Sequence, residues 1–119
     1  MRKGRPSATA EMVCSWRALE HTLPADQRIL DDPYARGFLG PLRRGLVDSA
    51  SALPTPARHA MLRRLDQALQ GFVTFVLARH RAIDELILST PSDQVVLLGA
   101  GYDTRPARLY ARLRESRVL

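Results

Sequence analysis

Cysteine is almost absent from this chain of 119 residues, in which Cys14 is the only one. A single cysteine excludes an internal disulfide framework and any metal site built from several cysteines. Long hydrophobic runs are missing as well, because no apolar stretch approaches the roughly 18 to 20 residues that a membrane-spanning helix needs. The basic start of the chain is not followed by the apolar segment of a secretory signal. These absences predict a cytoplasmic protein with no membrane partner.

Lysine is nearly missing too, because 17 of the 18 basic residues are arginine. With 12 acidic residues the formal net charge is +6, and such a balance raises the question of nucleic-acid binding. The excess is spread evenly, since residues 1–60 and residues 61–119 each carry nine basic and six acidic residues. No basic tail with interleaved aromatic residues is present. Nucleic acid is therefore a disfavoured partner.

The remaining composition is that of one globular domain. Hydrophobic residues make up 45% of the chain and charged residues 25%, which separates it from disordered chains. Apolar residues recur at three- and four-residue spacing over most of the first 89 positions, and this pattern indicates helices. The predicted helical segments are about 7–21, 34–39, 42–51 and 57–89. Asp32 and Pro33 form a helix start, and Gly71 is expected to divide the last segment.

A different pattern follows the helices. Residues 94–98 form a short apolar run that includes two valines and stops at Gly99. The run predicts a strand buried on both faces, of the kind found in parallel sheets. A helix is predicted over about 105–114, with Thr104 as its N-cap. Residues 117–119 look like the opening of a second strand.

The turn between this strand and this helix has the outline of a cofactor site. Gly99 and Gly101 allow the backbone to turn tightly and to approach a ligand, and a helix start beyond them offers free N–H groups. The alternative is a plain strand-to-helix turn. Thr104 replaces the third glycine of a dinucleotide fingerprint, and Asp103 would oppose a diphosphate. A ligand without a diphosphate is therefore favoured, and S-adenosylmethionine fits, because it carries a sulfonium, an ammonium and a carboxylate.

Arg79 is the second informative position. It lies three residues after Val76 and four before Ile83, so it falls on the apolar stripe of its helix. A guanidinium on a buried face needs an anionic partner. Arg79 either holds a cofactor carboxylate, forms an internal salt bridge, or extends its charged end to solvent.

Further charged residues follow Arg79 at helical spacing. His80 and Asp84 are four residues apart, and so are Arg81 and Glu85. Both pairs are interpreted as stabilising the helix rather than as catalytic groups.

Together these segments resemble the leucine carboxyl methyltransferase-like family of class I S-adenosylmethionine-dependent methyltransferases, and in particular its bacterial members. Three blocks carry the resemblance in order along the chain. They are Ser7 to Glu20 with Arg17-Ala18, Asp32-Pro33-Tyr34-Ala35 with Phe38-Leu39, and Ala78-Arg79 with Ile83-Asp84 followed by Val95 to Arg105. The last block, with its Leu-Gly-Ala-Gly-x-Asp-Thr-Arg loop, is the most specific, and the resemblance spans residues 7–119.

The resemblance implies an α/β fold, in which a mostly parallel, Rossmann-like sheet carries helices on both faces. Residues 1–93 would form an amino-terminal helical cap. Residues 94–119 would supply the first strand and the glycine loop of the sheet, and the rest of the sheet would be absent. We therefore expect a truncated methyltransferase domain that is mostly helical as it stands.

The resemblance also implies a set of cofactor contacts. Arg79 would grip the carboxylate of S-adenosylmethionine, and the loop would lie beside its amino acid end. The cofactor-binding residues predicted in this way are Arg79, Gly99, Ala100, Gly101, Tyr102, Asp103 and Thr104. Arg105 either joins them or braces the loop, and Arg17 lies near a basic position of the family's first helix. His80 replaces the family's usual small polar residue. No catalytic residue is identified, and no metal site is expected.

The chain is short for such an enzyme. An acidic residue about 20 positions after the glycine loop usually binds the cofactor ribose, but Glu115 is the only acid after Asp103. We therefore expect the amino-terminal part of a larger methyltransferase, inactive alone, that acts on an unknown acceptor such as a small-molecule or peptide carboxylate. A bare edge of strand 94–98 would favour self-association. The alternatives are a cofactor-free helical interaction module and a basic nucleic-acid binder.

Overall fold

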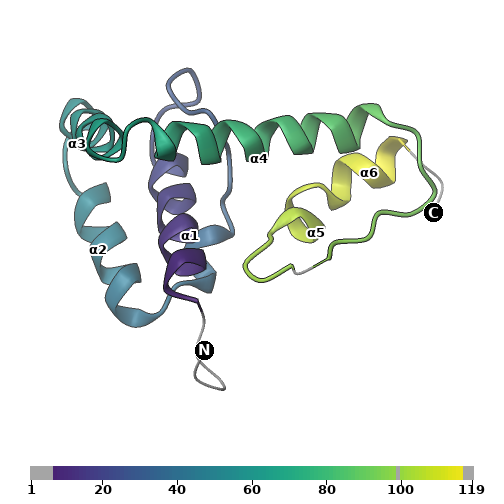
Figure 1. Cartoon of the computed structure of the whole chain (residues 1–119), viewed down its shortest axis with the longest axis horizontal. Coiled ribbons are helices and arrows are strands. Elements are labelled where there is room, and N and C mark those ends of the chain that lie inside the picture. The colour runs from purple at the N-terminus through teal and green to yellow at the C-terminus, as the bar shows by residue number, and fades with distance from the viewer. Residues whose placement is uncertain (1–6, 99, 117–119) are drawn as a thin grey trace.

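The computed structural model describes residues 7–98 and 100–116, and all regular secondary structure in these ranges is helical (Figure 1). The elements are α1 (Ala8–His21), the 3-10 helix η1 (Ala35–Phe38), α2 (Pro41–Ser51), α3 (Thr55–Ala68), α4 (Phe72–Ser89), α5 (Arg105–Arg108) and α6 (Tyr110–Ser116). The expectation of a mostly helical chain is confirmed. Within the described ranges, no helix combines the length and the apolar character that crossing a membrane requires.

Helix α4 runs along most of the longest dimension of the molecule (Figure 1). Its first half packs against α1 and α3, and α1 in turn contacts η1 and α2. Helices α5 and α6 lie below its second half, next to the segment that descends from the end of α4 (Figure 1). Helices α5 and α6 are thus joined to α4 through the segment of residues 90–104, which contains the glycine loop.

Two apolar clusters lie on opposite sides of α1. One contains Cys14 and Ala18 of α1 with residues of η1 and α2, and the other contains Trp16 with residues of α4. Trp16 also meets Phe72 edge to face, with ring centroids 5.9 Å apart. Because α1 buries side chains against both groups of helices, it is the central element of the core.

The predicted break at Gly71 is confirmed. Helix α3 ends at Ala68 and α4 begins at Phe72, with Gln70 at φ 55° and Gly71 at φ 82° between them. Left-handed backbone ends helices, and glycine adopts it without steric cost. The Gly71 N–H donates to the Asp66 carbonyl at 2.8 Å, which satisfies one carbonyl at the end of α3.

The strand predicted over residues 94–98 is not formed. Residues 94–97 have no regular secondary structure, and Val96 and Leu98 are 69% and 91% exposed rather than buried on both faces. A strand requires hydrogen bonds to a neighbouring strand. Within residues 7–98 and 100–116, nothing pairs with the backbone of this segment. The second strand predicted at residues 117–119 lies outside the described residues.

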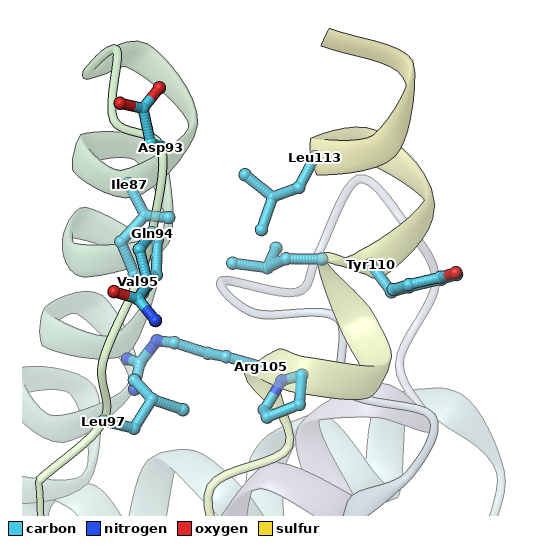
Figure 2. Close-up of a pocket in the computed structure, with 10 residues that line it drawn as sticks. Ile87, Asp93, Gln94, Val95, Leu97, Arg105, Tyr110 and Leu113 are labelled. Atoms are coloured by element: carbon cyan, nitrogen blue, oxygen red, sulfur yellow. The ribbon is translucent and has the colours of Figure 1, made fainter. Parts of the chain in front are cut away.

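An apolar cavity of about 330 Å³ lies beside this segment. Figure 2 shows Val95 and Leu97 along one wall, with Ile87 of α4 and Leu113 of α6 close by, while the Tyr110 ring points away. The α/β sheet expected from the resemblance is not directly visible among the residues that the structure describes. The division of the chain at residue 93 stays a prediction.

Candidate functional site

A second cavity, of about 480 Å³, opens between the start of α1, the middle of α4 and the loop before α5. Its volume lies within the roughly 300 to 1,000 Å³ that is usual for small-molecule sites. Five of the seven predicted cofactor residues line it, namely Arg79, Ala100, Gly101, Tyr102 and Asp103. Gly99 lies outside the described residues, and Thr104 is buried without lining the cavity. The fold therefore brings α4 and the glycine loop to one place.

Arg79 is exposed at this cavity rather than buried on the face of α4. The buried face of α4 carries Val73, Val76, Leu77 and Asp84, so the apolar stripe read from the sequence is rotated relative to it. The prediction that Arg79 lies on a buried face is therefore wrong. Its guanidinium makes no hydrogen bond or ion pair with any residue that the structure describes, which excludes an internal salt bridge within those residues.

The loop opposite Arg79 is held by α1. Gly101 has φ 50°, in the left-handed region that favours glycine, and the Asp103 N–H donates to the Ala100 carbonyl at 2.8 Å. Arg17 Nη2 donates to the Tyr102 carbonyl at 2.6 Å. The Tyr102 ring meets Phe38 edge to face. This tight turn presents the backbone of residues 100–102 along the cavity.

Thr104 ends the loop in a buried position, with 1% of its surface exposed. Its hydroxyl donates to Asp32 Oδ2 at 2.7 Å and accepts from Arg108 Nε at 2.7 Å. Thr104 occupies the predicted N-cap position of α5, but its side chain makes no capping hydrogen bond there. The Asp103 carboxylate takes that place and accepts from the Arg105 N–H at 2.9 Å.

Arg105 braces the loop, as one of its two predicted roles required. Its guanidinium binds Asp103 Oδ2 at 2.6 Å and Asp84 Oδ1 at 2.7 Å. Arg108 also donates to Asp84, which is 7% exposed. Asp84 therefore pairs with two arginines of α5, in place of the predicted pairing with His80. The exposed pair Arg81–Glu85 is present at 3.0 Å.

His80 lines the cavity next to Arg79. Its Nδ1 atom is buried and has no hydrogen-bond partner among the described residues. Burial lowers the pKa of His80 from 6.5 to about 4, and the positive charges of Arg17 and Arg105 act in the same direction. The imidazole is therefore neutral at neutral pH.

This neutral histidine makes stability depend on pH. The unfolded chain takes up a proton near pH 6.5, whereas the folded chain resists it until about pH 4. Stability is therefore complete above pH 6.5 and falls as the pH drops toward 4. Since the ring is partly exposed, we expect a loss of about 1 to 2 kcal/mol in urea unfolding. The His80→Gln variant should flatten this part of the profile, and an unchanged slope would contradict the assignment.

The charges around the cavity do not cancel at every position. Arg17 pairs with Asp32 at 3.4 Å, and Arg105 is neutralised by Asp84 and Asp103. Among the described residues that line the cavity, Arg79 is the cation left without a carboxylate. The arrangement suits an anionic group next to exposed loop backbone. The described part of the chain holds no group of three or more His, Cys, Asp or Glu side chains placed to bind a metal ion.

The sequence of this chain is similar to those of known proteins. The family model described as leucine carboxyl methyltransferase matches residues 10–118. Two curated proteins, from Mycobacterium avium (strain 104) and Mycolicibacterium paratuberculosis (strain ATCC BAA-968 / K-10), are each 31% identical over 109 residues. Their names class them as S-adenosyl-L-methionine-dependent methyltransferases. The matches cover 87% of this chain but 37% of each relative. No solved structure matches.

Proposed function

Because the chain belongs to the leucine carboxyl methyltransferase family, we propose that it is the amino-terminal part of an S-adenosylmethionine-dependent methyltransferase. In this proposal the cavity between α1, α4 and the glycine loop takes the amino acid end of the cofactor. The single observation that carries it is the unpaired Arg79 on a cavity that Ala100 to Asp103 also line. A cation without a partner beside exposed backbone suits a group that carries both a carboxylate and an ammonium.

Each group at the cavity has a separate part in binding. Arg79 would hold the cofactor carboxylate, and backbone groups of Gly99, Ala100 and Gly101 would meet the ammonium. The Asp103 carboxylate is engaged by Arg105, so it fixes the loop while lining the cavity. Neutral His80 adds no charge that would compete with Arg79 for the carboxylate. Thr104 would act from behind the loop, through its buried hydrogen bonds.

The bound cofactor supplies an activated methyl group, and the protein contributes binding, orientation and exclusion of water. A carboxylate acceptor, from a small molecule or a peptide, would need no proton removed before attack. The chain spans 37% of the length of its curated relatives. We propose that contacts to the ribose and adenine belong to the remaining length, so this chain alone should bind weakly and should not transfer a methyl group.

Substitution of Arg79 tests this proposal. S-adenosylhomocysteine, which has the same amino acid end, is titrated into the protein while amide NMR shifts are followed, because this readout detects weak binding. Loss of a charge-assisted hydrogen bond costs roughly 1.5 to 3 kcal/mol, so Arg79→Ala should raise the Kd at least about tenfold.

The matched control is Arg81→Ala, which removes the same charge from the same helix. Arg81 pairs with Glu85 at the surface and does not line the cavity. Its Kd should stay close to that of the wild type. Equal affinity of Arg79→Ala and the wild type would contradict the proposed site.

A further inference from the structure

Asp32 lies outside the cavity but touches what surrounds it. Its side chain is fully buried, and the whole residue is 1% exposed. Oδ1 accepts from the N–H groups of Tyr34 and Ala35, at 3.2 and 3.1 Å. These bonds place the chain at the start of η1, as an N-capping aspartate does. The Oδ1 atom of Asp32 therefore has a local structural role.

The other oxygen reaches distant parts of the chain. Asp32 Oδ2 accepts from the Thr104 hydroxyl at 2.7 Å, across 72 positions of sequence. It also lies 3.4 Å from Arg17 Nη1 and 3.8 Å from Arg108 Nε. Arg17 and Arg108 belong to α1 and α5, so one oxygen faces donors from three segments.

These donors control both flanks of the glycine loop. Arg17 uses its other amino group to hold the Tyr102 carbonyl, and Thr104 is the residue that ends the loop. The Asp32 charge keeps the buried Arg17 guanidinium compensated, because an unpaired buried cation is costly. Removing that charge would release Arg17 and Thr104 together.

We propose that Asp32 is a positioning residue, whose carboxylate fixes Thr104 and Arg17 and thereby holds residues 101–103 in the conformation that lines the cavity. The identity of the ligand rests on the proposed function, whereas the control of the loop by Asp32 does not. An asparagine of the same shape would present an amide at one of the two oxygen positions. It would carry no charge for Arg17 or Arg108, so the shape of the side chain alone cannot replace the carboxylate.

Hydrogen exchange of the Asp103 amide tests this proposal without any ligand. That N–H donates to the Ala100 carbonyl, so its exchange rate reports opening of the loop turn. In Asp32→Asn we expect it to exchange at least about tenfold faster, with amides inside α3 unchanged. The control Asp31→Asn alters a half-exposed neighbour that pairs with His21 and Arg28, and it should leave the loop unchanged. An unchanged Asp103 rate, or a rise shared by α3, would overturn the proposal.

Two variants of Thr104 keep the proposal testable if Asp32→Asn does not fold. Thr104→Val removes the hydroxyl while it leaves the Asp32 bonds to Tyr34 and Ala35 in place, so it separates the loop role from the capping role. We expect the faster Asp103 exchange in Thr104→Val and wild-type exchange in Thr104→Ser, which restores the donor. Faster exchange in both variants, or in neither, would count against Asp32 acting through this hydroxyl.

Titration with S-adenosylhomocysteine separates this inference from the proposed function. A wild-type chain that shows no shift changes at any ligand concentration would contradict the proposed cofactor site, and the exchange rates would still decide the role of Asp32. If the wild type does bind, Asp32→Asn should weaken binding at least about threefold while Asp31→Asn does not. Unchanged affinity in a loosened loop would show that the loop position does not matter for the ligand and would overturn the positioning role.

Discussion

The Asp84→Asn variant is expected to lose about 3 kcal/mol of its free energy of unfolding. The Asp84 side chain is 10% exposed and binds Arg105 and Arg108, whose side chains are 10% and 5% exposed. Removing one partner of a buried ion pair typically costs about 3 to 5 kcal/mol, because the remaining charge stays buried without compensation. Asparagine keeps the shape and one acceptor, and Arg105 keeps its ion pair with Asp103 at 2.6 Å, so the lower end of that range applies. Urea unfolding followed by circular dichroism measures the loss.

The neighbouring residue provides the control for this experiment. Glu85 pairs with Arg81 at the surface, and their side chains are 66% and 57% exposed. Exposed pairs of this kind contribute about 0.5 kcal/mol or less. Glu85→Gln should therefore be nearly neutral. If both variants lost the same stability, the ion pairs of Asp84 with Arg105 and Arg108 would not contribute the stability that their burial indicates.

The second large effect concerns association of two copies of this chain. Within the described residues, the backbone of 94–98 makes no hydrogen bonds, and Val96 is 69% exposed. An unpaired apolar segment of this kind is a template for strand pairing. We propose that a second copy pairs with it, so sedimentation should show a monomer–dimer equilibrium. Val96→Lys should raise the dissociation constant at least about tenfold, because it places two like charges in the paired region.

A lysine at another exposed apolar position distinguishes strand pairing from non-specific hydrophobic association. Leu42 of α2 is 79% exposed and lies far from residues 94–98 along the chain. Leu42→Lys should leave the dissociation constant unchanged. A chain that stays monomeric at all concentrations, or an equal effect of both lysines, would contradict pairing through this segment.

The helices could be predicted because their causes are local. The periodic apolar positions of α1 and the left-handed Gly71 between α3 and α4 act within a few residues. The strand at 94–98 depends on partners that its own residues do not supply. Its apolar run indicates a tendency to form a strand. A sheet forms only where a second strand donates and accepts hydrogen bonds.

The sequence indicates most of the residues that line the cavity but not the contacts among them, and their role in binding a cofactor stays a prediction. Arg79 and the glycine loop are separate features of the sequence, and the fold places them on one cavity. The exposure of Arg79 does not follow from the spacing of apolar residues, because the packing of α4 on α1 sets which stripe turns inward. Asp32 and Thr104 each look like ordinary helix caps, and nothing in their local patterns links residues 72 positions apart. Only the tertiary arrangement joins them.

The buried thiol of Cys14 is a natural probe for local opening of the packing around α1. Cys14 is 0% exposed, its Sγ donates to the Ala35 carbonyl at 3.2 Å, and burial raises its pKa. It is also the only cysteine in the sequence. A thiol reagent therefore has one target, and it reaches that target only when α1 separates from η1 and α2. The labelling rate measures the frequency of that separation without any engineered probe.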